Sequence, residues 1–204
     1  MVVITSSIVV SQDKIFEQKS SKYRRWTFCY SKFMNNCKII IIRGYPSSGK
    51  TTAAKLLSKR TGSIFIDHNA ILTFLAGMVG NDQGIYSEIH NLELAMAKKI
   101  IQENKNVIVA RGFSSQESIA PYLGAAKTLG ADVFVFRLAA SKDNLKLRVV
   151  AEDRKKDFNP TINEEALLEW IDSNPLRDIE GEYEINANES IDKVVNQMLF
   201  ILSS

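Results

Sequence analysis

One eight-residue segment constrains the fold of this 204-residue chain more than any other. Residues 44–51 read Gly-Tyr-Pro-Ser-Ser-Gly-Lys-Thr and match the pattern G-x-x-x-x-G-K-[ST] in full. A β-branched run, Lys38–Ile42, precedes the segment, and a helical pattern over Thr51–Lys59 follows it. The pattern needs this strand, loop and helix in order to hold phosphate. The sequence therefore predicts a phosphate-binding loop at residues 44–51.

The residue types in this loop suit a nucleoside triphosphate. Gly44 and Gly49 let backbone N–H groups approach phosphate without a Cβ in the way, and the helix N-terminus adds partial positive charge. Lys50 is expected to reach the β- and γ-phosphates, and the Thr51 hydroxyl to bind Mg²⁺. The residues expected to bind ATP here are Gly44, Tyr45, Pro46, Ser47, Ser48, Gly49, Lys50, Thr51 and Thr52.

The rest of the chain alternates β-branched runs with helical patterns. The further runs are Ser63–Ile66, Asn106–Ala110, Asp132–Leu138 and Glu182–Asn186. They show little polar alternation, as expected of strands covered on both faces. Five strands alternating with helices predict an α/β fold with a parallel sheet.

Capping residues and apolar spacing mark the expected helices. A helix over Gly84–Asn104 would bury Ile85, Ile89, Leu92, Met96 and Ile100 on one face. Ser114 with Glu117 and Thr161 with Glu164 predict capping boxes, and Ser141 predicts a further helix start. The last helix carries apolar residues from Ile191 to Leu202 at helical spacing.

Residues 1–36 differ from residues 37–204. The net charge is +3, from 26 basic and 23 acidic residues, and residues 1–36 hold six of the bases against two acids. The basic and aromatic stretch Lys22–Trp26 could bind single-stranded nucleic acid. A loosely ordered extension is favoured instead, and Met34 could be the natural start. Residues 37–204 form the expected domain.

Composition excludes several classes of protein. Apolar residues make up 45% of the chain, enough for a buried core, and no apolar run approaches the roughly 18–20 residues of a membrane span. Cys29 and Cys37 cannot build a disulfide framework, and with the two histidines they lack zinc-site spacing. A cytoplasmic protein with reduced thiols is expected.

Together, the loop and the alternation of strands and helices resemble a known group of enzymes. From Lys38 to the C-terminus the chain resembles small P-loop kinases related to zeta toxins, chloramphenicol phosphotransferases and polynucleotide 5′-hydroxyl kinases. It is more distantly similar to shikimate, gluconate and nucleoside-monophosphate kinases. The resemblance implies a three-layer P-loop NTPase fold, with helices on both faces of a five-stranded parallel sheet, and the use of ATP and Mg²⁺. A GTPase is disfavoured because Asn104-Lys105-Asn106-Val107 lacks the aspartate of the base-reading motif.

The acceptor end of the site is expected after the second strand. Ligands bind beyond the carboxyl ends of parallel strands, so Asp67 could accept the proton of an attacking hydroxyl or help hold the metal. A simple helix N-cap is the other interpretation of Asp67. His68 and Asn69 could contact the acceptor. No Lys or Arg occurs from Thr61 to Ala97, which favours an uncharged acceptor over an anionic one.

Three further regions complete the expected site. The resembled families usually have an aspartate where Arg111 stands, so Arg111 either binds substrate or marks weakened turnover. The resemblance places a lid after the fourth strand, where Arg148 and Arg154 would stabilise the transferring phosphoryl group. Asn186 and Ala187 would border the adenine.

These observations predict a kinase that transfers the γ-phosphoryl group of ATP to a hydroxyl of an uncharged small molecule or nucleoside. One alternative is a polynucleotide 5′-hydroxyl kinase, so a nucleic-acid acceptor is open but not favoured. The other is a nucleotide-binding regulatory module with weak or no turnover. The sequence leaves open the identity of the acceptor and the oligomeric state.

Overall fold

The structure is a computed structural model that describes residues 36–79, 85–150 and 163–204. Cys37–Ser204 form one compact unit. The extension predicted for residues 1–36 lies outside the described residues except for Asn36, and it stays a prediction. In the described part of the chain, no helix is long and apolar enough to cross a membrane.

Five parallel strands form the single sheet of the described residues. Their spatial order is β2-β3-β1-β4-β5, so β1 lies in the centre, between β3 and β4. Ile40 of β1 faces Ile108 of β3 on one side and Phe134 of β4 on the other. The strands are β1 (Lys38–Arg43), β2 (Ile64–Ile66), β3 (Val107–Arg111), β4 (Asp132–Ala139) and β5 (Tyr183–Asn186).

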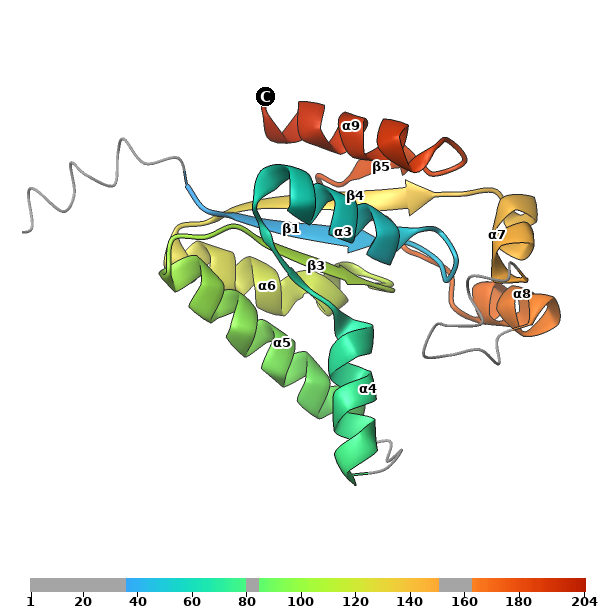
Figure 1. The fold of residues 1–204 in the computed structure, drawn as a ribbon, viewed down its shortest axis with the longest axis horizontal. Helices are drawn as coiled ribbons and strands as arrows, with labels where there is room; N and C mark the ends of the chain where they lie inside the picture. The colour runs from blue at the N-terminus through green and yellow to red at the C-terminus, as the bar shows by residue number, and fades with distance from the viewer. Residues whose placement is uncertain (1–35, 80–84, 151–162) are drawn as a thin grey trace, which may run out of the picture. The chain divides into compact units, whose positions relative to one another are not determined.

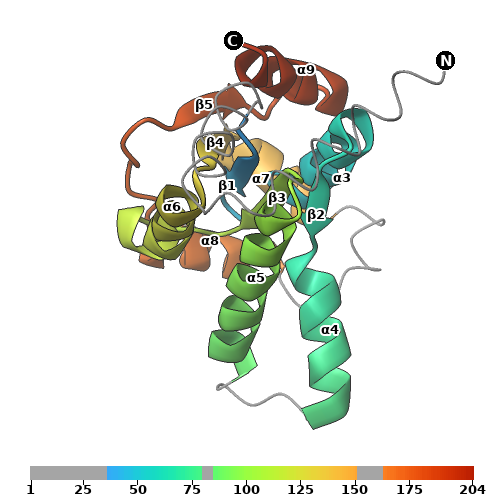
Figure 2. The same cartoon turned by 90° about the vertical axis from the view of Figure 1, so that its left-hand side faces the viewer.

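Helices cover both faces of this sheet, as Figures 1 and 2 show. α3 and α9 pack on one face, and α5 and α6 pack on the other. The three-layer α/β fold expected from the sequence is therefore confirmed. The helices are α3 (Lys50–Thr61), α4 (His68–Val79), α5 (Ile85–Gln102), α6 (Gln116–Leu129), α7 (Lys142–Val149), α8 (Glu164–Ser173) and α9 (Ile191–Leu202).

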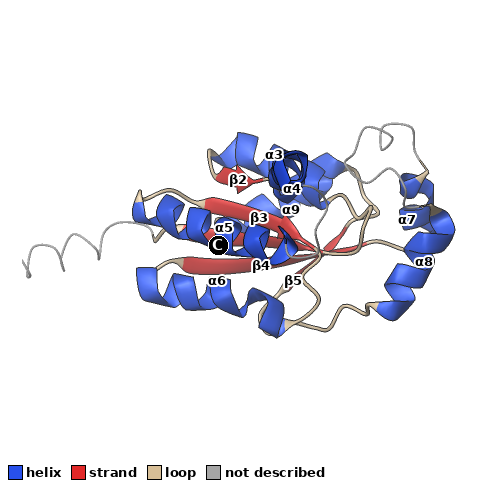
Figure 3. Cartoon of the chain, turned by 90° about the horizontal axis from the view of Figure 1, so that it is seen from below, coloured by secondary structure: helices blue, strands red, loops and turns tan. Residues whose placement is uncertain are grey.

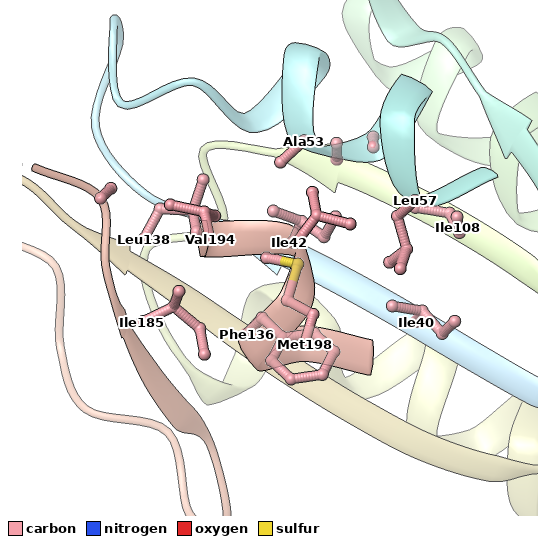
Figure 4. Packing of buried hydrophobic residues seen from close by; sticks show 14 residues of the cluster. Ile40, Ile42, Ala53, Leu57, Ile108, Phe136, Leu138, Ile185, Val194 and Met198 are labelled. Atoms are coloured by element: carbon pink, nitrogen blue, oxygen red, sulfur yellow. The ribbon is translucent and has the colours of Figure 1, made fainter. Parts of the chain in front are cut away.

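Successive residues of β1 enter opposite cores. Ile40 and Ile42 are fully buried against α3 and α9, in the cluster shown in Figure 4. Ile39 and Ile41 are buried in the cluster on the α5 and α6 side. Covering both faces removes the need for polar alternation, which explains the apolar runs in the sequence.

The buried face of α5 differs from the predicted one. Leu92 and Met96 were expected in the core but are 41% and 38% exposed. The buried positions instead recur at every fourth residue and include a carboxylate: Ile85, Ile89, Glu93, Ala97 and Ile101. The helix therefore faces the core with these positions rather than with the face that carries Leu92 and Met96.

Two helix starts also differ from their predicted positions. α6 begins with a capping box of Ser115 and Ser118 rather than Ser114 and Glu117. α8 is capped by Asn163, whose side chain accepts a hydrogen bond from the Ala166 backbone, while Thr161 lies outside the described residues. The predicted cap at Ser141 is confirmed, because its hydroxyl accepts from the Asn144 backbone.

Two smaller clusters pack helices against each other outside the two main cores. α7 and α8 lie past the carboxyl end of β4, as Figure 3 shows. Leu145 and Val149 of α7 pack with Leu167 and Ile171 of α8, and Tyr45 joins this small core. α4 and α5 pack through a separate cluster around Leu72 and Ile89.

Candidate active site

The loop between β1 and α3 has a conformation that demands glycine at its first position. Gly44 has φ 150°, and a Cβ there would lie 2.7 Å from Ser48 Oγ and 2.9 Å from the Leu138 carbonyl oxygen. Gly49, with φ 92°, is the N-cap of α3. The backbone therefore turns tightly enough to aim N–H groups inward at the start of a helix, the geometry of an anion cradle.

Polar groups within this cradle fit a phosphate. Lys50 Nζ donates to the Tyr45 carbonyl oxygen at 2.7 Å, so the side chain folds back over the loop. Ser48 Oγ is buried and has no hydrogen-bond partner among the described residues. A buried hydroxyl without a partner is costly, and a phosphate oxygen would satisfy it. The residues present therefore fit the triphosphate that the sequence predicts.

The loop opens onto a cavity of about 1100 Å³. Side chains from the carboxyl ends of several strands reach it, as expected for an open parallel sheet. Of the predicted site residues, the cavity is lined by Pro46, Ser47, Ser48, Gly49, Lys50, Thr51, Thr52, His68, Asn69, Arg111, Arg148 and Ala187. Gly44, Tyr45, Asp67 and Asn186 are not in this lining, and Arg154 lies outside the described residues.

Both carboxylate oxygens of Asp67 have partners. Oδ1 accepts from the backbone N–H groups of Asn69 at 3.1 Å and Ala70 at 3.4 Å, the pattern of an N-cap on α4. Oδ2 lies 3.1 Å from Nζ of Lys55 on α3. The N-cap interpretation is thus observed, and the proton-accepting role of Asp67 stays a prediction.

Glu93, which is not among the predicted site residues, organises one side of the cavity. This fully buried carboxylate of α5 pairs with Arg111 Nη1 at 2.9 Å through Oε2, and with His68 Nδ1 at 2.9 Å through Oε1. Burial raises the pKa of the nearby Tyr122 hydroxyl, and the charge of Glu93 adds to that rise. The only signal in the sequence is one acidic residue within an apolar series of four-residue spacing.

Comparison with known proteins places this site in a family. A family model described as an AAA domain matches residues 39–174, about two thirds of the chain. The chain belongs to this AAA domain family. Its fold is that of a P-loop kinase domain, as the resemblance predicted. No curated protein matches the sequence at a significant level.

Solved structures similar to this P-loop kinase domain are distant in sequence. A Chloroflexus aurantiacus protein described as a kinase is 17% identical with a TM-score of 0.66, covering 83% of this chain and 98% of its own. An APS kinase of Mycobacterium tuberculosis is 16% identical, with a TM-score of 0.59. The match covers 84% of this chain and 100% of the APS kinase chain. A chain of the Pnkp1/Rnl/Hen1 RNA repair complex is 18% identical, with a TM-score of 0.54. The match covers 83% of this chain and 46% of that chain.

Helix α7, which carries the predicted lid arginine Arg148, is joined to the loop after β5. Arg148 of α7 donates from Nη2 to the Ala187 carbonyl oxygen at 2.7 Å. Asn188 Oδ1 accepts from the Ser141 backbone at 2.9 Å and from Asn144 Nδ2 at 2.7 Å. These bonds bring the predicted lid arginine and the predicted adenine-bordering residue into direct contact.

A second set of contacts connects α7, α8 and the P-loop. Lys142 Nζ lies 2.8 Å from Asp172 Oδ1, and this hydrogen bond and the negative charge of Asp172 raise the pKa of Lys142. The ring of Trp170 meets that of Tyr45 edge to face, with centroids 6.2 Å apart. The Tyr45 hydroxyl accepts from the Leu176 backbone at 3.2 Å.

The described residues contain no group of three His, Cys, Asp or Glu side chains placed to hold a metal ion. Mg²⁺ in kinases is commonly bound through one or two protein ligands together with nucleotide phosphates and water. Thr51, at the start of α3 and in the cavity lining, suits that arrangement. The site therefore fits a metal that arrives with the nucleotide.

Proposed function

We propose that this chain is an ATP- and Mg²⁺-dependent kinase that transfers the γ-phosphoryl group to a hydroxyl of an uncharged small molecule or nucleoside. The observation that carries the proposal is the convergence of the P-loop, α4, β3 and α7 on one cavity of about 1100 Å³. Ligand pockets commonly measure about 300–1,000 Å³, so this volume suffices for a nucleotide and a small acceptor together.

The nucleotide would occupy the side of the cavity formed by the P-loop and the loop after β5. Bound Mg²⁺ would offset charge on the phosphates, with Thr51 and Asp67 as its protein ligands. Lys50 would contact the β- and γ-phosphates, and Asn186 and Ala187 would border the adenine. Arg148, held against Ala187, and Arg154 would neutralise charge on the transferring group.

The acceptor would bind at the carboxyl ends of β2 and β3. His68, Asn69 and Arg111 line the cavity there, and Asp67 directly precedes His68 in the sequence. We assign to Asp67 the task of orienting the hydroxyl and taking its proton as oxygen attacks the γ-phosphorus. Location in the cytoplasm, which supplies ATP and Mg²⁺, belongs to this proposal.

A transfer screen with labelled ATP tests the function. The panel comprises nucleosides, oligonucleotides, neutral and acidic sugars, and aminoglycoside- and amphenicol-like compounds. We expect label on an uncharged hydroxyl compound, and its loss in Lys50→Ala. Lys127→Ala is the matched control, because Lys127 is an exposed lysine of α6 outside the cavity lining.

Two observations favour the alternative of a regulatory module that binds nucleotide without turnover. Arg111 stands where the resembled families usually have an aspartate, and in the structure Asp67 is already paired with Lys55. Tight ATP binding, with no transfer to any acceptor in the panel, would support that alternative. Label on oligonucleotides alone, falling steeply with salt, would instead indicate a polynucleotide kinase.

A further inference from the structure

Glu93 has no access to solvent, yet it carries a carboxylate. A buried charge is stable only when it is paired and hydrogen-bonded, and each oxygen of Glu93 has one such partner at 2.9 Å. The partners come from different elements, His68 from the first position of α4 and Arg111 from the last position of β3. Glu93 therefore joins three segments that are distant in the sequence.

Both partners of Glu93 line the cavity, whereas Glu93 itself does not. Its hydrogen bonds to His68 and Arg111 restrict the rotamers of both side chains, so it sets how they present their remaining polar atoms. Arg111 is also held from another side, because its guanidinium carbon lies 5.4 Å from the centroid of the Phe113 ring. An arginine fixed in this way keeps N–H groups that can still donate.

The pair also cancels charge. Arg111 carries one positive charge and Glu93 one negative charge, with Nη1 and Oε2 2.9 Å apart. Such a pair has little net attraction for an anion, although it can donate hydrogen bonds. Lys55, another cation of the lining, lies 3.1 Å from Asp67, but its side chain is largely exposed, whereas the Arg111 pair is nearly buried.

We infer that Glu93 is a specificity-determining residue, which positions His68 and Arg111 as hydrogen-bonding groups and excludes anionic acceptors by neutralising Arg111. The inference rests on the proposed function and names the residue that selects its substrate class. Tyr86, a half-exposed ring of α5 in the same lining, gives the acceptor an apolar contact. A neutral compound with a ring and hydroxyl groups, such as a nucleoside, fits these groups.

Glu93→Gln tests the inference, because it keeps the side-chain shape and leaves the charge of Arg111 uncompensated. The first readout is binding of inorganic sulfate, measured by calorimetry while Mg²⁺ and a non-hydrolysable ATP analogue fill the P-loop. We expect sulfate to bind at least about tenfold more tightly to Glu93→Gln than to the unmodified protein. Glu88→Gln, the same change at an exposed position of α5, should leave sulfate binding unchanged.

The double variant Glu93→Gln with Arg111→Gln separates charge from folding. It is neutral at both positions, so it should lose the added sulfate affinity while keeping the circular dichroism spectrum of the folded protein. Equal sulfate binding by the folded single variant and the unmodified protein would overturn the inference. The same gain in the double variant would also overturn it, because the gain would then not come from Arg111.

The second readout is transfer to a nucleoside compared with its 5′-monophosphate. Glu93→Gln should raise the ratio of kcat/KM for the monophosphate over the nucleoside by at least about tenfold. An equal loss with both acceptors would contradict a selective role. If the unmodified protein transfers to neither acceptor, the proposed function fails for this class, while the sulfate measurement still decides the role of Glu93.

Discussion

Gly44 lies at the point where β1 turns into the P-loop, and the structure leaves no room there for a side chain. Gly44→Ala would place a methyl group 2.9 Å from the Leu138 carbonyl oxygen at a φ of 150°. We expect a loss of about 1–3 kcal/mol in the free energy of unfolding, together with weaker nucleotide binding. Urea unfolding and a titration with an ATP analogue measure these two effects.

Gly124→Ala is the control for this substitution. Gly124 lies within α6, and a Cβ there would meet nothing within 4 Å. Alanine is the better helix former, so this variant should be as stable as the unmodified protein or slightly more stable. Equal stability of Gly44→Ala and Gly124→Ala would show that the tight turn is not required.

Replacing one carboxylate oxygen of Asp67 by an amide group distinguishes its two interpretations, helix N-cap and proton acceptor. Asp67→Asn keeps an oxygen that can accept from the Asn69 and Ala70 backbones, so the α4 cap survives. It removes the charge, and with it the capacity to take a proton. We expect kcat for transfer to fall by about 10²–10⁴, with unchanged thermal unfolding. Full activity in Asp67→Asn would leave Asp67 as a cap only.

Whether a site residue could be predicted from the sequence depends on whether its partners are close to it along the chain. The P-loop could be predicted because its residue types and their spacing follow from phosphate chemistry in one continuous segment. The role of Glu93 could not, because its partners His68 and Arg111 are 25 and 18 positions away in the sequence. An isolated acidic residue in a helical pattern is ordinarily solvent-exposed, and only the fold shows its burial.

The helices and strands also differ in how far local sequence predicts them. Every strand end was predicted to within one residue. Burial on both faces leaves a continuous β-branched run in β1 and β3, whereas the edge strands β2 and β5 are partly exposed. The face of α5 was predicted wrongly at Leu92 and Met96, because size and apolarity favoured them over Ala97. Packing against the sheet selects small residues at close approaches, and that preference depends on the neighbouring element rather than on the helix itself.

The start of α6 offers a test of cap position. Ser115 and Ser118 form its capping box. The Ser115 hydroxyl also makes a hydrogen bond to the Glu117 carboxylate, which lowers the pKa of Glu117. Ser115→Ala should lower the free energy of unfolding by about 1 kcal/mol at neutral pH. Ser114→Ala, at the cap position that the sequence favoured, should have a smaller effect. Chemical unfolding of both variants measures the difference.

The effect of Ser115→Ala should depend on pH in a defined direction. A carboxylate whose folded-state pKa is lowered contributes stability above its unfolded pKa and loses it as pH falls through the folded value. The Ser115 contribution that acts through Glu117 should therefore be present at pH 7 and decline below the ordinary pKa of 4.5. A difference between the two proteins that grows as pH falls would contradict this assignment.

At the level of the whole domain, Arg43 connects the centre of the sheet to the segment between α8 and β5. It is fully buried, with Nη1 3.0 Å from Glu182 Oε2 and Nη2 2.7 Å from the Arg177 carbonyl oxygen. Burial lowers the pKa of Arg43, and the negative charge of Glu182 opposes that change. The strand that leads into the P-loop is thereby tied to the segment that follows α8.

Arg43→Met tests whether this connection stabilises the domain. Removing Arg43 leaves the Arg177 carbonyl oxygen and Glu182 Oε2 without this partner, although Arg137 Nε stays 3.1 Å from Glu182 Oε1, so we expect a loss of about 1–3 kcal/mol in the free energy of unfolding. Lys193→Met is the matched control, because Lys193 pairs with Glu189 on the surface and such pairs contribute about 0–1 kcal/mol. If both variants unfold at the same urea concentration, Arg43 is not the structural connection that its burial and contacts indicate.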